Sequence, residues 1–261
     1  MTHLIDYPTI LFIFLFVTYA VALEIGFRLA SRRNANQDPT LHEQAVGVRD
    51  GVIVLLSLLL GFTLALALPR NDLRRQLIVD EANSIGTTSL RAELLPEPAR
   101  SKSLALLRDY VNARLQFSEH GPDSAEAAAA TVRSRELQAQ LWDQAKDATT
   151  GTPAPVISLY MTALNDTIDL ESKRLAARRN RVPISIWIML FLISILACLS
   201  FGFSLRRRFL LSMIVTPLMI AIVMALIADL DTPIRGFIRV DLDSLHQLQS
   251  DLHNESAKPQ P

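Results

Sequence analysis

Apolar residues gather in four long runs along the chain, and no charged or histidine side chain interrupts any of them. A helix needs roughly 20 apolar residues to cross a hydrocarbon core of about 30 Å. The pattern therefore predicts an integral membrane protein with four transmembrane helices, at about residues 8–28, 51–69, 183–205 and 209–228. The first uncharged run, 7–23, is long enough only if its helix continues to about Arg28, with Glu24 and Arg28 one turn apart near the interface.

The first run, near the N-terminus, could be either a cleaved signal peptide or a retained membrane helix. Ala20-Val21-Ala22 fits a small-x-small cleavage pattern. The segment 1–6 before the run carries no Lys or Arg, whereas Arg28, Arg32 and Arg33 follow it, which reverses the charge order of a secretory signal. We therefore expect this run to stay in the protein as a membrane helix.

Residues 70–182 separate the second and third runs and carry 16 basic and 15 acidic residues, so we expect them in water. Prolines and glycines divide them into four helices whose apolar residues recur at helical spacing, with no period-two alternation. The predicted fold is all-α. The predicted domains are a transmembrane hairpin (1–69), a four-helix extramembrane bundle inserted between spans two and three (70–182), a second hairpin (183–230), and a tail (231–261) with a turn, a short amphipathic helix and a frayed end.

Composition argues against several classes of function. The chain has 26 basic and 26 acidic residues, and a net charge of zero disfavours a nucleic-acid partner. The single Cys and the five His residues never occur at metal-ligand spacing, and no nucleophile, phosphate-loop or calcium-loop motif is present. We therefore predict no enzymatic activity, no metal and no cofactor.

The second apolar run carries the most specific pattern. Ser57, Gly61 and Ala65 form a stripe of small residues at spacing four, next to Phe62. Such a stripe suits close helix packing, and it equally suits a pore lining with Phe62 as a hydrophobic constriction. The cations that follow are either interfacial anchors or, in a ring of subunits, a vestibule that attracts anions: Arg70, Arg74 and Arg75.

Two polar clusters in the bundle predict a network close to the membrane. Its candidate members are Asp80, Glu81, Asn83, Asn165, Asp169, Arg174 and Arg178. Helical spacing also lets Asp169 pair with Lys173, and Glu171 with Arg174. A structural network and a ligand site both remain open for these residues. Likewise, Asp229 and Asp231 after the fourth run suit either turn capping or a cation.

Three segments carry a resemblance to a known family. Residues 79–96, residues 164–183, and residues 229–240 resemble, in order, the signatures of a bacterial membrane family described as bestrophin-like. Bestrophins are pentameric anion channels whose second membrane helix lines the pore and continues into a cytosolic helical domain. The Trp-rich stretch that bestrophins carry after that helix is absent here, and Trp142 and Trp187 lie elsewhere.

The resemblance implies a function and a location. We expect a homo-oligomer in the lipid bilayer of a bacterial inner membrane that passes small anions, with the bundle on the cytoplasmic side. The alternative is a non-conducting scaffold or signalling protein whose bundle binds a partner protein.

Overall fold

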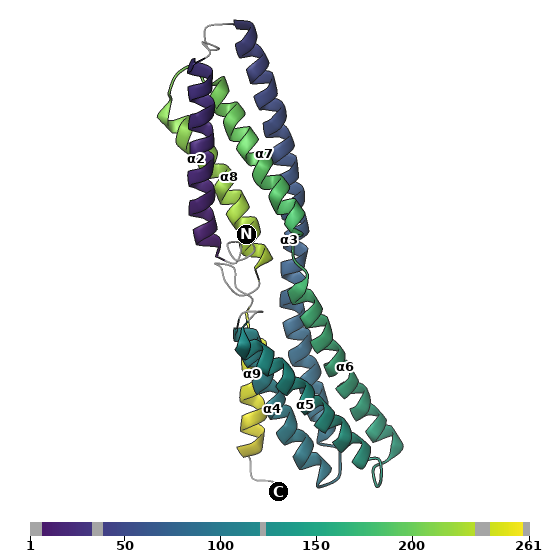
Figure 1. The fold of residues 1–261 in the computed structure, drawn as a ribbon. Coiled ribbons are helices and arrows are strands. Elements are labelled where there is room, and N and C mark those ends of the chain that lie inside the picture. The colour runs from purple at the N-terminus through teal and green to yellow at the C-terminus, as the bar shows by residue number, and fades with distance from the viewer. Residues whose placement is uncertain (1–6, 33–38, 121–123, 233–240, 258–261) are drawn as a thin grey trace. The chain divides into compact units, whose positions relative to one another are not determined.

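The computed structural model describes residues 7–32, 39–120, 124–232 and 241–257, and all regular secondary structure within these ranges is helical (Figure 1). The helices are α2 (Pro8–Arg32), α3 (Pro39–Ala92), α4 (Ala99–Glu119), α5 (Ala125–Asp147), α6 (Ala154–Arg179), α7 (Ile184–Ser204), α8 (Leu210–Asp231) and α9 (Asp243–Ala257).

Four of the helical segments are long and apolar enough to cross a membrane, in agreement with the four predicted apolar helices. They lie in α2, α3, α7 and α8. The helix α3 begins at Pro39, twelve residues before the apolar run at Gly51, and continues through Pro69 without a break.

The chain divides into two compact units. The first, Met1–Asn71 with Arg181–Arg239, contains the apolar runs and is called here the apolar unit. The second, Asp72–Asn180 with Val240–Pro261, is called the charged unit. The amphipathic helix of the tail, α9, therefore belongs to the same unit as α4, α5 and α6.

The apolar unit turns many large apolar side chains outward, including Ile13, Val17 and Leu192. Its interior contains Tyr19 and Leu23 of α2 with smaller residues of the neighbouring helices, among them Cys198 of α7, which has no exposed surface. Because lipid is as apolar as these outer side chains, this distribution suits a bilayer rather than water.

Two glycines bring the backbones of α2 and α7 together. A Cβ added to Gly26 would lie 2.1 Å from the carbonyl oxygen of Leu199, and one added to Gly202 would lie 2.0 Å from that of Leu23. No larger residue fits such a crossing, so the two glycines set the distance between these helices.

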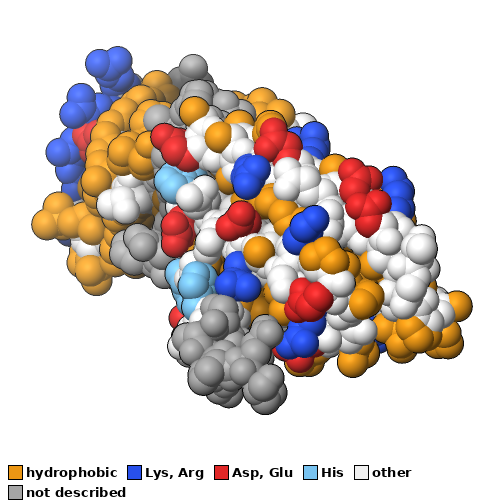
Figure 2. Space-filling view, turned by 90° about the horizontal axis from the view of Figure 1, so that it is seen from below, with side chains coloured by type: hydrophobic (Ala, Val, Ile, Leu, Met, Phe, Trp, Pro, Cys, Tyr) orange, Lys and Arg blue, Asp and Glu red, His pale blue; other side chains and the backbone are white. Residues whose placement is uncertain are grey.

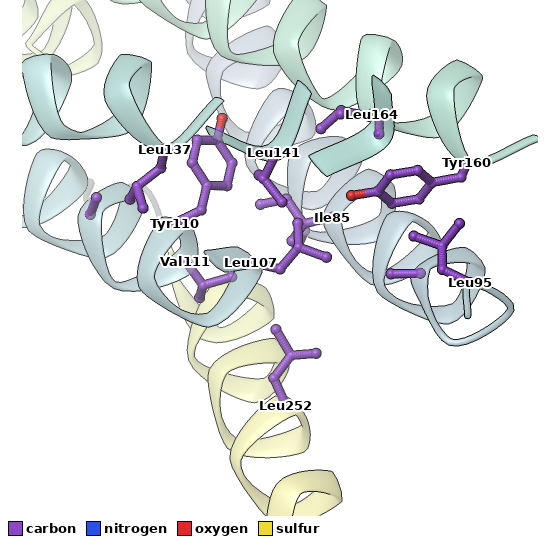
Figure 3. Packing of buried hydrophobic residues seen from close by; sticks show 14 of the residues in the cluster. Ile85, Leu95, Leu107, Tyr110, Val111, Leu137, Leu141, Tyr160, Leu164 and Leu252 are labelled. Carbon is purple, nitrogen blue, oxygen red and sulfur yellow. The ribbon is translucent and has the colours of Figure 1, made fainter. Parts of the chain in front are cut away.

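The charged unit has a conventional apolar core (Figure 3). Leu107, Tyr110 and Val111 of α4 lie with Leu137 and Leu141 of α5, and Ile85 of α3, Leu164 of α6 and Leu252 of α9 belong to the same buried cluster.

The helix α9 is joined to α4 by apolar and polar contacts. Leu245 is fully buried in the core cluster, and the side-chain amide of Gln249 donates to that of Asn112 at 2.7 Å. The surface seen in Figure 2 intersperses acidic and basic side chains, so neither sign of charge dominates that face.

Candidate functional site

The face of α3 predicted to line a pore is exposed in the apolar unit. Leu56, Leu60 and Ala67 are buried, whereas the small residues of the opposite stripe and Phe62 are exposed, Phe62 by 60%. A Cβ added to Gly61 would meet no described atom within 4 Å. Within the described part of the chain, this side of α3 therefore lacks a covering helix, and its stripe consists of Ser57, Gly61 and Ala65.

The three arginines predicted at the end of this segment differ in environment. Arg70 is half-buried and Arg75 is exposed. Arg74 is only 5% exposed, and it donates to the carbonyl oxygens of Ala177 (3.2 Å) and Asn180 (2.9 Å). These carbonyls close the C-terminus of α6, where a cation satisfies acceptors that the helix leaves unpaired. Within this single chain, Arg74 is therefore a buried helix cap, whereas the vestibule predicted for Arg70, Arg74 and Arg75 stays a prediction.

In the charged unit, α3, α4 and α6 contribute to a buried group of charges. Glu81 accepts from Nε of Arg114 at 2.8 Å and also pairs with Arg174. Glu171 lies 3.4 Å from Nη1 of Arg114 and accepts from the hydroxyl of Tyr110 at 2.8 Å. These five residues, called here the ionic cluster, are all less than 9% exposed.

The ionic cluster corrects one predicted pairing and adds two members. Arg174 contacts Glu81 on α3, and Glu171 contacts Arg114 and Tyr110 on α4, in place of the expected Glu171–Arg174 pair along α6. The sequence analysis did not include Arg114 or Tyr110 in the predicted network. Their helical spacing from Leu107 and Val111 places both on the apolar face of α4, and this spacing could have indicated that they are buried.

Burial and charge act together on these groups. Burial opposes the charged form of Arg114, but Glu81, Tyr110 and Glu171 outweigh it and raise the pKa of Arg114 above its ordinary value. Burial lowers the pKa of Arg174, with Glu81 acting in the opposite direction. Burial also raises the pKa of Tyr110 well above 10.0, so its hydroxyl stays a neutral donor.

Arginines also surround the ring of Phe117 at the end of α4. The guanidinium of Arg178 lies 4.2 Å from the ring centroid, and that of Arg114 lies 4.6 Å from it. Arg178 donates to the carbonyl oxygens of Phe117 (2.6 Å) and His120. It thereby caps α4, as Arg74 caps α6.

The other members of the predicted network lie apart from the ionic cluster. Asp80, Asn83 and Asp169 border an open polar groove of about 410 Å³, together with Asp166 and Lys173. Asn165 is exposed and borders a different hollow. Among the described residues, no group of three or more His, Cys, Asp or Glu side chains is placed to hold a metal ion.

Asp231 at the end of α8 has a structural partner. Its carboxylate accepts from the backbone N–H of Val182 at 3.0 Å, just before α7 begins. A carboxylate in this position compensates unpaired donors and the positive end of the helix dipole. Asp231 therefore caps the start of α7, and Asp229 is also buried. The turn that Asp229 and Asp231 were predicted to cap lies outside the described residues.

The family model of the Bestrophin-like domain matches residues 13–245. The chain belongs to this bestrophin-like family. No curated protein matches this bestrophin-like chain.

Solved structures share the fold of this bestrophin-like chain. Crystal structures of a bacterial bestrophin homolog from Klebsiella pneumoniae, each with a single substitution, align with TM-scores of 0.70 and 0.69 at 13% and 14% sequence identity. The alignments cover 94% and 95% of this chain and 99% of each solved chain. The predicted family is confirmed, and the all-helical bestrophin fold with it.

Proposed function

We propose that this bestrophin-like protein is a homo-oligomeric channel for small anions, and that the exposed face of α3 lines the conduction path. The observation that carries the proposal is the stripe of Ser57, Gly61 and Ala65, which lies opposite the buried side of α3 in a chain with a bestrophin fold. Small side chains leave room for ions when several copies of one helix surround an axis.

The proposed path has a constriction and an attractive entrance. Phe62 and the leucines around it form a hydrophobic ring that excludes water when narrow. Arg75 and Arg70 lie beyond the end of the apolar run, where several copies would raise the local concentration of anions. The proposed entrance does not include Arg74, because its guanidinium caps α6.

The proposal includes a location. The protein lies in a bacterial inner membrane, with the helices between the second and third spans, together with α9, on the cytoplasmic side. This arrangement follows the layout of bestrophins.

The first test is the subunit number together with chloride flux. Native mass spectrometry of the detergent-purified protein should give a closed ring of subunits, and the same sample in chloride-loaded liposomes should release chloride. A monomer or dimer without flux would contradict the channel and favour the scaffold, whose partner would then be sought by crosslinking.

The second test concerns the constriction. Phe62→Ala should raise chloride conductance severalfold because it widens the hydrophobic ring. Leu192→Ala on α7 is the control, since Leu192 is similarly exposed, by 58%, but lies outside the proposed path. Unchanged conductance in a Phe62→Ala protein that still conducts would exclude Phe62 as the constriction.

A further inference from the structure

An apolar groove lies in the apolar unit where α2, α7 and the first turns of α3 meet. Its volume is about 380 Å³, within the range of sites that hold small molecules. Its apolar lining comes from all three helices and consists of Leu29, Leu41, Ala45, Val48, Leu199 and Phe203.

The local sequence explains why the groove is apolar on each side. Leu41, Ala45 and Val48 recur at helical spacing along the start of α3, so they share one face. On the opposite side, Gly26 borders the groove and belongs to the close crossing of α2 with α7, and the apolar side chains of Leu29 and Phe203 lie beside it in the lining.

Basic residues surround the same end of the unit. Phe203 lines the groove, and Arg206, Arg207 and Arg208 follow it within five residues, all three exposed. Arg28 and Arg32 belong to the last turns of α2, and Arg49 follows the groove residue Val48.

The acidic residues nearby do not neutralise this charge. Glu24 accepts from both Arg28 and Arg208, at 2.6 Å each, and Asp50 lies 2.8 Å from Arg49. Among the described residues, neither Arg206 nor Arg207 forms an ion pair. Two exposed cations, Arg206 and Arg207, are therefore left for a ligand.

The residues after the arginines indicate a membrane interface. Phe209, Leu210 and Leu211 are exposed by 58%, 74% and 62%, which requires an apolar surrounding directly beside the charges. Apolar side chains next to exposed arginines are typical of the level of the lipid headgroups.

We propose that the groove binds an acyl chain of an anionic phospholipid, whose phosphate group contacts Arg206 and Arg207. The proposal does not depend on anion conduction. A zwitterionic lipid supplies the same acyl chain but no net negative charge, so the arginines give the site its preference.

The test uses the full-length protein in detergent, analysed by native mass spectrometry after equal additions of phosphatidylglycerol and phosphatidylcholine. Phosphatidylglycerol should be retained preferentially. The double variant Arg206→Gln with Arg207→Gln should weaken its apparent affinity about twenty-fivefold, at roughly fivefold per arginine. The matched control, Arg135→Gln with Lys173→Gln, removes two exposed charges from the charged unit and should change nothing.

A second variant tests the groove itself. Ala45→Trp fills the groove and should abolish retention of the lipid. Gly47→Trp adds the same side chain at a residue outside the groove lining, where an added Cβ meets no described atom within 4 Å, and should not abolish retention. Equal retention of both lipids, or retention unchanged by Ala45→Trp, would overturn the proposal. Loss of subunits from the Ala45→Trp oligomer with lipid still bound to each chain would instead identify the groove as a contact between copies, and would equally overturn it.

Discussion

At the scale of single residues, Glu81 is a fully buried carboxylate between two arginines. Its carboxylate contacts Arg114 and Arg174, and neither Glu81 nor Arg114 has any exposed side-chain surface. Nη2 of Arg114 has no hydrogen-bond partner among the described residues. Since removing charges from water costs several kcal/mol per ion, the attraction within the cluster mainly offsets that cost.

Neutralising Glu81 should therefore destabilise the fold strongly. Glu81→Leu leaves the buried charge of Arg174 without its carboxylate and removes the stronger of the two contacts of Arg114, and we expect a loss of about 3–5 kcal/mol. Thermal unfolding in detergent measures it, with Asp80→Asn as the control, since Asp80 is only half-buried and we expect a change within about 0.5 kcal/mol. Equal unfolding temperatures for the two variants would contradict this account.

Tyr110 should make the folded state sensitive to alkaline pH. Burial raises its pKa in the folded protein above the value of about 10 in an unfolded chain. The unfolded state therefore releases the phenolic proton first, and stability that is complete below pH 10 declines as the pH rises above it.

Tyr110→Phe removes the ionisable hydroxyl. The unfolding free energy of the variant should therefore fall less steeply between pH 9 and pH 11 than that of the parent protein. The measurement compares the slope of the variant with that of the parent protein over this range. A slope identical in both proteins would show that Tyr110 does not carry the effect.

At the scale of helices, the close contact between α2 and α7 depends on two glycines, Gly26 and Gly202, which have no side chain at the crossing. Gly26→Val or Gly202→Val would place carbon atoms about 2 Å from backbone oxygens of the facing helix, so the helices must separate. We expect either variant to reduce sharply the yield of protein that elutes as a single species in size-exclusion chromatography. Gly47→Val should leave the yield unchanged, because a Cβ added at Gly47 meets no atom of another helix within 4 Å among the described residues.

The apolar runs predict the membrane helices well because a bilayer imposes one simple requirement, a sufficient length without charge. The start of α3 at Pro39 was not predictable in the same way, since residues 39–50 mix apolar and charged side chains and become informative only as the wall of a groove. Likewise, the spacing of Gly26 and Gly202 says nothing of their contact, because they come from distant parts of the chain.

The candidate site was predictable in its residue types but not in its pairings. Glu81, Arg174 and Arg178 were expected in a polar network, and the structure buries all three. Glu81 and Arg174 contact each other, and α4 supplies the further partners, where Arg114 interrupts an apolar face. Which carboxylate an arginine contacts depends on how three helices pack, and helical spacing within α6 alone favoured the wrong pair.

At the scale of the whole molecule, the exposed stripe of α3 faces its own copies in a ring of subunits but faces lipid in a single chain, so crosslinking can distinguish the two. A cysteine in place of Ser57 should crosslink neighbouring copies in membranes because a shared axis brings equivalent positions together. Cys198 is fully buried, so the introduced thiol is the reactive one.

Leu192→Cys provides the comparison for this experiment, since Leu192 is exposed on α7 away from the stripe. Crosslinked dimers and larger species on a denaturing gel should form with Ser57→Cys and not with Leu192→Cys. Equal crosslinking at both positions would indicate random collisions and would contradict a shared axis at α3.

The ionic cluster also constrains how this sequence can change during evolution. A single replacement of Glu81, Arg114, Glu171 or Arg174 passes through a state with an uncompensated buried charge, which costs a large part of the 5–15 kcal/mol that keeps a typical protein folded. Replacement of the whole cluster by well-packed apolar residues carries no such penalty. Natural selection should therefore transmit these four positions as a block, retained together or lost together, while the half-buried Asp80 and the exposed Asn165 around them drift independently.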